Sequence, residues 1–300
     1  MTRLEQPSPP AKKFRTAALL VTAAFALPLY ELVRLALDSE LHSHILLIPL
    51  VSWYVWRFLD SDHSLATFTP PKQFSIGTLV SGVLGLAAVG AYLYLRIQLR
   101  LPVTEYLWAG ILGYLLILLA VALRTVGWNR LQPHKFAVGF LVFFIPLPLA
   151  VTNLMSIVLQ HGSAEVSNWT LQMSGLPMLR EGLIFRLPGL TIQVAEECSG
   201  VRSTLVLFIT SLIAGKMFLK TGWKRAVLAG LTLPLGLFRN ALRITVLSWL
   251  SVHVDSEIIN GPLHHQGGPI FFVISLLPLF GLLWYFRRSE SSKTTVREKS

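Results

Sequence analysis

The chain has 300 residues, of which 53 % are hydrophobic and only 14 % are charged. An ordinary soluble domain carries about 25 % charged residues, so this composition excludes a conventional soluble protein and an intrinsically disordered one. The net charge of +11 does not indicate nucleic-acid binding, because the Lys and Arg residues form short clusters between long apolar runs, as in the cytoplasmic loops of membrane proteins.

Apolar runs long enough to cross a bilayer, which takes about 20 residues, recur along the whole chain. They predict an all-α integral membrane protein with about eight transmembrane helices. The expected spans are 17–37, 43–59, 74–95, 105–126, 136–157, 199–219, 226–251 and 269–286. The first run is too long for the apolar region of a signal peptide and lacks a small-residue cleavage site, so we interpret it as an uncleaved helix.

The distribution of basic residues predicts the orientation of the chain in the membrane. Eighteen Lys and Arg residues lie near the N-terminus, the loops after spans two, four and six, and the C-terminal tail. The opposite-side loops hold only four, namely Arg96, Arg100, Arg180 and Arg186. By the positive-inside rule both termini are cytoplasmic. We therefore expect basic cytoplasmic tails at 1–16 and 287–300, flanking a membrane domain at 17–286.

The segment 158–197 is the largest piece expected on the outer face. Up to about Gly175 it is typical of a small surface helix, and after that a hairpin is predicted around the turn signal Pro188–Gly189. The chain then reaches Cys198, the only cysteine, at the outer end of the sixth span. A single cysteine excludes an internal disulfide framework.

Charged residues inside a span are costly and therefore indicate function by default. The seventh span carries Arg239, Asn240 and Arg243, and the two arginines are four residues apart on one helix face. Upstream, Pro234 is expected to loosen the helix and free a backbone carbonyl. The following outer loop contains His264 and His265.

The topology therefore predicts that a thiol, two arginines and two histidines meet near the outer face. A cysteine at a helix N-terminus beside cations becomes a reactive thiolate, a histidine moves a proton, and an arginine stabilises a developing oxyanion. Each feature also has a plainer explanation: packing for Cys198, ion pairs with Glu196 or Glu197 for the arginines, and solvation for the histidines. A zinc site combining the histidines with Asp255 or Glu257 lacks the HExxH spacing.

Five motifs follow one another along the chain: Ser43–His44–Ile45–Leu46–Leu47–Ile48–Pro49–Leu50, Ile145–Pro146–Leu147–Pro148, Glu197–Cys198–Ser199–Gly200–Val201–Arg202–Ser203, Asn240–Ala241–Leu242–Arg243, and His264 with Gly268 and Phe272. With these motifs the sequence resembles the exosortase/archaeosortase family from about residue 30 to 285. The family's common Ser-His-Gly is Ser43–His44–Ile45 here, a departure that affects no catalytic position.

The resemblance implies a multi-pass cysteine peptidase or transpeptidase in a bacterial inner membrane, with its site near the periplasmic face. Its substrates would be membrane-anchored proteins with a C-terminal sorting signal: a short motif such as Pro-Glu-Pro (PEP-CTERM), a spanning helix and a basic cluster. The family's Cys-Arg-His constellation falls on Cys198, Arg243 and His264. Supporting or alternate positions are His265, Arg239, Asn240 and Ser199. The family assigns its arginine a proton-donor role, whereas we expect electrostatic stabilisation from Arg243.

The sequence does not identify the acceptor of the cleaved protein. Transfer to a lipid- or polysaccharide-linked group would make the protein a cell-surface transpeptidase, and transfer to water would make it a hydrolase, a thiol protease. We expect no cofactor, no metal and no nucleic acid. The alternatives are a multi-pass transporter or lipid-handling protein that uses Arg239 and Arg243 as an anionic-substrate site, and a structural partner of a polysaccharide assembly system.

Overall fold

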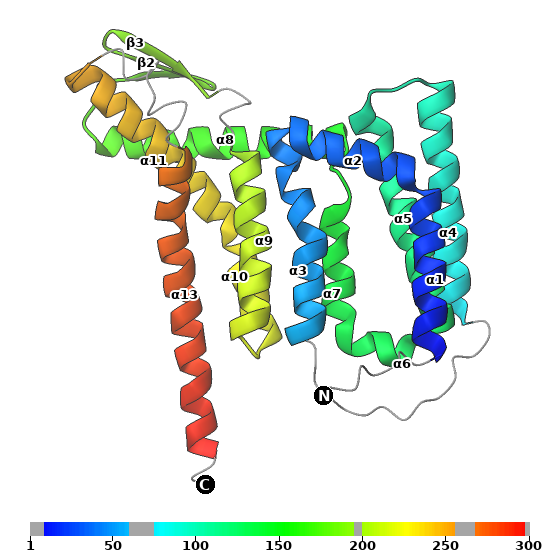
Figure 1. The fold of residues 1–300 in the computed structure, drawn as a ribbon. Coiled ribbons are helices and arrows are strands. Elements are labelled where there is room, and N and C mark those ends of the chain that lie inside the picture. The colour runs from blue at the N-terminus through cyan, green and yellow to red at the C-terminus, as the bar shows by residue number, and fades with distance from the viewer. Residues whose placement is uncertain (1–8, 60–74, 195–199, 256–267, 298–300) are drawn as a thin grey trace, which may run out of the picture. The chain divides into compact units, whose positions relative to one another are not determined.

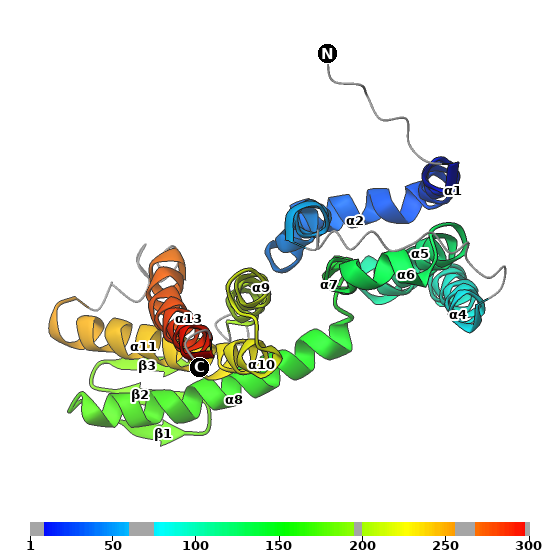
Figure 2. The same cartoon turned by 90° about the horizontal axis from the view of Figure 1, so that it is seen from below.

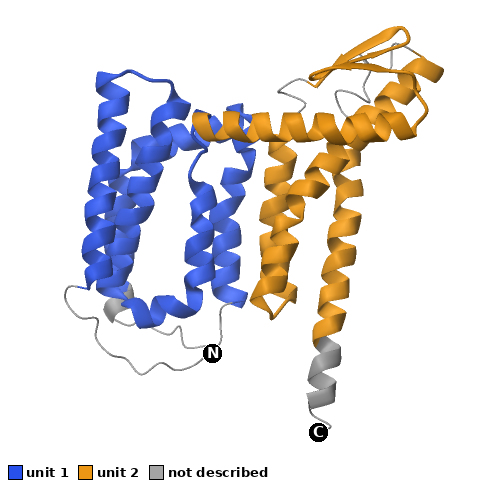
Figure 3. Cartoon of the chain, turned by 180° about the vertical axis from the view of Figure 1, so that it is seen from behind, with its two compact units in different colours: residues 1–149 blue, residues 150–300 orange. Residues whose placement is uncertain are grey.

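A computed structural model describes residues 9–59, 75–194, 200–255 and 268–297. These residues are almost entirely helical (Figure 1), which confirms the expected all-α integral membrane protein. The chain forms two compact units, Met1–Leu149 and Ala150–Ser300 (Figure 3).

Within the described residues, five helices are long and apolar enough to cross a membrane, or up to seven if each of two bent helix pairs counts as one span. The five are Ile76–Gln98, Val103–Thr125, Val201–Phe218, Gly222–His253 and Gly268–Glu290. About eight were expected. The differences lie where an expected span is bent, interrupted or built from short helical pieces.

The first expected span, 17–37, is bent by 70° between α1 (Pro9–Ala24) and α2 (Ala26–Asp38). The bend follows from Pro28, whose ring clashes with the carbonyl four residues earlier and which has no N–H to donate to it. That carbonyl belongs to Ala24, the last residue of α1. The sequence therefore contained the signal for this bend.

The second expected span, 43–59, consists of three short pieces. They are the 3₁₀-helix η1 (Glu40–Leu47), α3 (Ile48–Tyr54) and the π-helix η2 (Val55–Leu59). The Ser52 hydroxyl donates to the carbonyl of Ala137, 2.8 Å away, and so joins α3 to α7 (Lys135–Phe140).

The third and fourth spans form an antiparallel pair of helices. They are α4 (Ile76–Leu93), extended by the π-helix η3 (Tyr94–Gln98), and α5 (Val103–Thr125). Glycines allow the close approach: a Cβ on Gly85 would lie 2.8 Å from Cγ1 of Ile117. Small residues at such contacts are typical of membrane helix pairs.

The fifth expected span, 136–157, is wrong in its boundaries. After α6 (Trp128–Leu131), η4 (Gln132–His134) and α7, the 3₁₀-helix η5 (Leu141–Phe144) gives way to an extended residue, Ile145. Two prolines, Pro146 and Pro148, then prevent the helix from continuing. What was expected as the end of a span plus a separate surface helix is one continuous helix, α8 (Leu149–Met173).

The second unit begins with α8 and an antiparallel sheet. The strands β1 (Leu179–Glu181), β2 (Ile184–Leu187) and β3 (Leu190–Gln193) are ordered β1-β2-β3. The β2–β3 pair is the predicted hairpin, with Gly189 in the left-handed region at φ 72°. The sheet contributes Phe185 and Leu187 to a core cluster with Leu171 of α8 and Ile244 of a later helix.

The described residues of this unit form four further helices: α9 (Val201–Phe218), α10 (Gly222–Gly230), α11 (Thr232–His253) and α13 (Gly268–Arg297). The helices α9 and α13 share a core through Leu207 and Leu279, and α8 crosses their direction (Figures 1 and 2). The seventh expected span is divided between α10 and α11 at Leu231. Pro234 explains the division, because the carbonyl four residues earlier belongs to Gly230, the last residue of α10.

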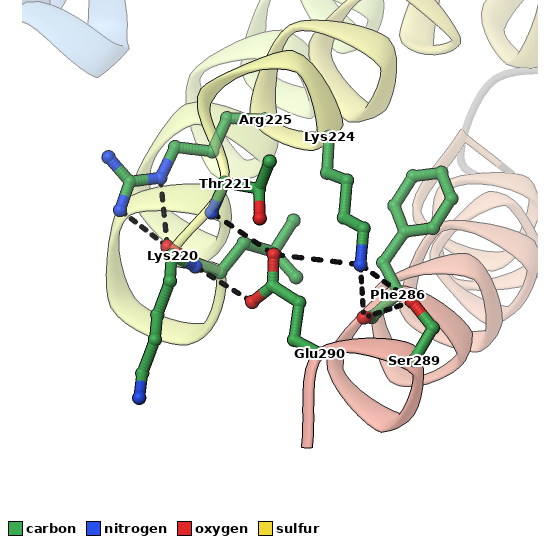
Figure 4. A network of polar contacts seen from close by, with 8 residues as sticks. Lys220, Thr221, Lys224, Arg225, Phe286, Ser289 and Glu290 are labelled. Carbon is green, nitrogen blue, oxygen red and sulfur yellow. Dashed lines mark hydrogen bonds and ion pairs between the residues drawn. The ribbon is translucent and has the colours of Figure 1, made fainter. Parts of the chain in front are cut away.

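Polar contacts join α13 to the turn between α9 and α10 (Figure 4). We call this region of unit 2, residues 219–225 with 286–290, the turn end. Lys224 is 6 % exposed, and its Nζ donates to the Phe286 carbonyl at 3.1 Å and to the Ser289 hydroxyl at 2.6 Å. Its ammonium also lies 3.6 Å from Oε1 of Glu290, whose carboxylate accepts the backbone N–H groups of residues 220 and 221 at 2.9 and 3.0 Å.

Candidate functional site

The predicted site residues fall into two groups. Arg239, Asn240 and Arg243 lie on α11, whereas Cys198, Ser199, His264 and His265 lie outside the described residues. For the second group, the structure therefore shows only the described residues that flank it. Their surroundings are the sheet end of unit 2, defined here as β1–β3, Gly200 and the facing residues of α8, α9 and α11.

Gly200 is the residue from which α9 begins. Its φ of 78° lies in the left-handed region, where a side chain is strained. Its carbonyl accepts the N–H of Thr204 at 2.9 Å and the Ser203 hydroxyl at 3.1 Å. Nη2 of Arg239 also donates to this carbonyl, at 3.5 Å. A Cβ on residue 200 would lie 2.6 Å from that nitrogen, so glycine is required both for the backbone and for the approach of Arg239.

The contact between α9 and α11 rests on a second glycine. A Cβ on Gly236 would lie only 2.5 Å from Oγ1 of Thr204, so the two helices touch closely here. Gly236 is three residues before Arg239 and four before Asn240, which puts all three on one face of α11. Because of this close contact, the polar residues of α11 lie beside the first turn of α9.

Both leading residues of that stretch are buried. Arg239 is 6 % exposed and Asn240 is 2 % exposed, whereas Arg243, one turn later, is half-buried. Within the described part of the chain, neither Nη1 of Arg239 nor Nδ2 of Asn240 has a hydrogen-bond partner. The buried hydroxyl of Thr204 also lacks one there.

The chain is also anchored on the other side of 195–199. Val194 is 1 % exposed, its N–H donates to the carbonyl of Leu183 at 3.0 Å, and its own carbonyl accepts Nε2 of Gln160 at 2.5 Å. Val194 packs in the same cluster as Ile244, which directly follows Arg243 in α11. The predicted hairpin thus leads the chain toward the helix that carries the arginines.

The two arginines of the sheet region are paired. Arg180 donates to both carboxylate oxygens of Glu165, at 2.6 and 3.0 Å, and this contact raises its pKa above the ordinary value. Arg186 pairs with Glu181 at 2.9 Å. Arg239 differs from both, since no ion pair joins it to a carboxylate among the residues that the structure describes.

A comparison with protein families decides the identity of the chain. The family described as transmembrane exosortase (Exosortase_EpsH) matches residues 36–281, more than four fifths of the sequence. This chain belongs to the transmembrane exosortase family. No curated protein and no solved structure matched it. The match confirms the resemblance and makes the protein, in general terms, a membrane-embedded sorting transpeptidase.

The match to the exosortase family covers most of each unit and includes every predicted site residue. The early motif around Ser43 and His44 lies in η1 of unit 1, where the Nδ1 atom of His44 lies 2.9 Å from the Leu41 carbonyl. The Ile145–Pro148 motif is the break before α8. Reasoning from the sequence did not assign roles to Gly200, Gly236 and Thr204. The spacing of Gly236 to Arg239 on one helix face was the available signal.

Proposed function

We propose that this exosortase is a cysteine transpeptidase that cleaves the C-terminal sorting signal of surface-destined proteins through a thioester at Cys198. One observation supports the assignment of the site in particular. The Gly200 carbonyl, two residues after Cys198 in the chain, accepts a hydrogen bond from Arg239, so the α9 entry meets the polar stretch of α11. Only two peptide units, which span at most about 7.6 Å, separate Cys198 from Gly200 in the chain.

The chemical steps balance without a cofactor. The Cys198 thiolate attacks the carbonyl carbon of the scissile peptide, a C–S bond forms, and the C–N bond breaks. His264 protonates the departing amine, and the backbone N–H groups and Arg243 stabilise the intermediate oxyanion. An acceptor amine or hydroxyl then attacks the thioester and releases the thiol. Water in place of that acceptor gives hydrolysis.

Two structural features support the assigned partners. Arg243 precedes Ile244, which shares a core cluster with Val194, the last described residue before the cysteine segment. His264 lies four residues before Gly268, where α13 begins, and α13 packs against α11. His265, Asn240 and Ser199 stay as alternates in these roles.

The placement in the cell is part of the same proposal. We propose an inner-membrane protein with cytoplasmic tails at 1–16 and 287–300, a membrane domain at 17–286, and the sheet end on the outer side. A substrate's basic tail then stays in the cytoplasm while its recognition motif reaches Cys198. The lipid bilayer and a lipid- or polysaccharide-linked acceptor are the other partners.

The test is processing of a co-expressed protein that carries the C-terminal signal, followed by its mass. Cys198→Ala and Cys198→Ser are expected to abolish processing at unchanged membrane levels of the enzyme. Because Cys198 is the only cysteine, a thiol-reactive label reports on it alone, and a wild-type adduct released by hydroxylamine would identify the thioester. Unchanged processing in Cys198→Ala overturns the proposal and favours a binding or transport role for the arginines.

A further inference from the structure

Arg239 is a buried cation whose charge is not neutralised by the described residues around it. Its side chain is 6 % exposed, Nη2 reaches only the Gly200 carbonyl at 3.5 Å, and Nη1 is buried without a partner there. A guanidinium stays protonated in proteins and offers five donors and no acceptor. Burying such a group without an opposite charge destabilises a fold, so its presence calls for an explanation.

The groups around Arg239 add positive potential. Arg243 follows one turn later on the same face of α11. The helix α9 begins directly after Gly200, and a helix N-terminus carries partial positive charge. The nearby Asn240 adds a second buried donor, Nδ2, without a partner in the described chain. Every one of these groups favours an anion.

We propose that Arg239, beside the positive N-terminal end of α9, binds an oxygen anion of the substrate. The proposal rests on the proposed function for the source of that anion. Two sources share this chemistry: a carboxylate side chain close to the scissile bond, and the oxyanion of the tetrahedral intermediate. Planar bidentate recognition of a carboxylate is the geometry for which a guanidinium is suited.

The first experiment measures stability and needs no activity. Arg239→Met and Arg239→Lys are compared with wild type as purified full-length protein in detergent, by thermal unfolding. Arg239→Met is expected to melt at or above the wild-type temperature, because it removes an uncompensated buried charge. The matched control is Lys224→Met, which removes an equally buried cation that has three partners and is expected to lower the melting temperature. If the melting temperature of Arg239→Met falls as far as that of Lys224→Met, Arg239 has a structural role and the proposal is overturned.

The second experiment detects the anion directly. Acetate, compared with acetamide at the same concentration and with ionic strength held constant by chloride, is expected to raise the melting temperature of wild type more than that of Arg239→Met. Equal shifts in both proteins overturn the proposal. If wild type processes no substrate but acetate still raises its melting temperature more than that of Arg239→Met, the proposed function fails while the anion site stands.

The third experiment distinguishes the two sources in the processing assay. Arg239→Met is expected to lower processing at least tenfold, with partial rescue by Arg239→Lys. If the anion is a substrate carboxylate, changing the acidic residues of the signal to amides lowers wild-type processing and has no further effect in Arg239→Met. If the anion is the oxyanion, the loss caused by Arg239→Met and the loss caused by the amide changes multiply. In that case Arg239→Met lowers the maximal rate of processing. Processing by Arg239→Met at the wild-type rate overturns the proposal.

Discussion

The two ends of unit 2 treat buried polar groups in opposite ways. At the turn end, Lys224 has two hydrogen-bond acceptors and an ion pair with Glu290, whose carboxylate accepts two backbone N–H groups (Figure 4). At the sheet end, Arg239 is equally buried, yet one of its terminal nitrogens has no partner in the described chain. A satisfied buried network stabilises a fold, whereas an unsatisfied one destabilises it and persists where function requires it.

The two ends differ in whether their buried cations have partners, and not in whether they carry cations. Cations occur at both ends, so charge alone does not separate structure from function. The presence or absence of hydrogen-bond partners does separate structure from function, because a buried cation whose donors are all bonded has none left to bind a substrate. The variants that follow change one end at a time, in order of decreasing effect.

Gly200→Ala is expected to have the largest effect. The added Cβ meets Nη2 of Arg239 at 2.6 Å, and the left-handed backbone is strained by about 1–2 kcal/mol. Either the start of α9 or the guanidinium must shift, and a displacement of about 1 Å in a catalytic site costs on the order of 100-fold in rate. The measurement is the rate of substrate processing.

The matched control is Gly182→Ala in the turn between β1 and β2. This glycine also has a positive φ, 64°, but a Cβ there meets nothing within 4 Å. It should share the backbone strain and keep processing. Equal losses in both variants would mean that strain alone matters, and the contact between Arg239 and Gly200 would then have no role.

Lys224→Met is expected to be the largest stability effect at the turn end. Removing one partner of a buried ion pair costs about 3 kcal/mol or more, because the other charge is left uncompensated. Thermal unfolding in detergent measures the loss, and processing at a permissive temperature should stay near the wild-type rate. Lys220→Met is the control: that side chain is exposed, and only its backbone N–H takes part in the network. A loss of processing at full stability in Lys224→Met would contradict the assignment of this end to structure.

The sequence predicted much of this fold for identifiable reasons. Long apolar runs predicted most of the membrane helices, and the Pro-Gly turn predicted the β2–β3 hairpin. The bend at Phe25 and the boundary between α10 and α11 at Leu231 were predictable too, since a proline follows the preceding helix end by four residues in each case. The continuous α8 was missed because its first half is apolar like a span and its second half polar like a surface helix.

Helical periodicity could not rank Arg239 against Arg243, and only the family resemblance favoured Arg243. The two are four residues apart on one face of α11, so periodicity treats them alike. What separates them is the register of α11 against α9, which the contact between Gly236 and Thr204 sets. Neither of those residues is chemically distinctive by itself. Whether a buried donor has a partner likewise depends on tertiary packing that no local pattern encodes.

Gly236→Ala tests that register directly. Its Cβ would lie 2.5 Å from Oγ1 of Thr204, a short branched side chain that cannot swing away like the end of a long one. Overpacking of this kind costs about 1–3 kcal/mol and should push α11 from α9, so both stability and processing fall. In the double variant Gly236→Ala/Thr204→Ser, residue 204 loses its methyl group and keeps the hydroxyl that the new Cβ would meet. In Gly236→Ala/Thr204→Ala, residue 204 loses both groups, so only this second double variant should restore processing. Full activity in Gly236→Ala would show that the site does not depend on this contact.

Gln160→Leu is expected to have the smallest effect, because it acts on the better-supported flank of the 195–199 segment. The amide donates to the Val194 carbonyl at 2.5 Å, and loss of one such hydrogen bond costs about 1 kcal/mol. Val194 stays held by the Leu183 carbonyl and by its core cluster. Processing should therefore fall far less than in Gly200→Ala, where the added Cβ meets Nη2 of Arg239 directly. Gln172→Leu, on an exposed position of the same helix, controls for the added apolar surface. A loss as severe as that of Gly200→Ala would mean that the segment is positioned from the sheet and not from the start of α9, and the comparison of the two flanks would be reversed.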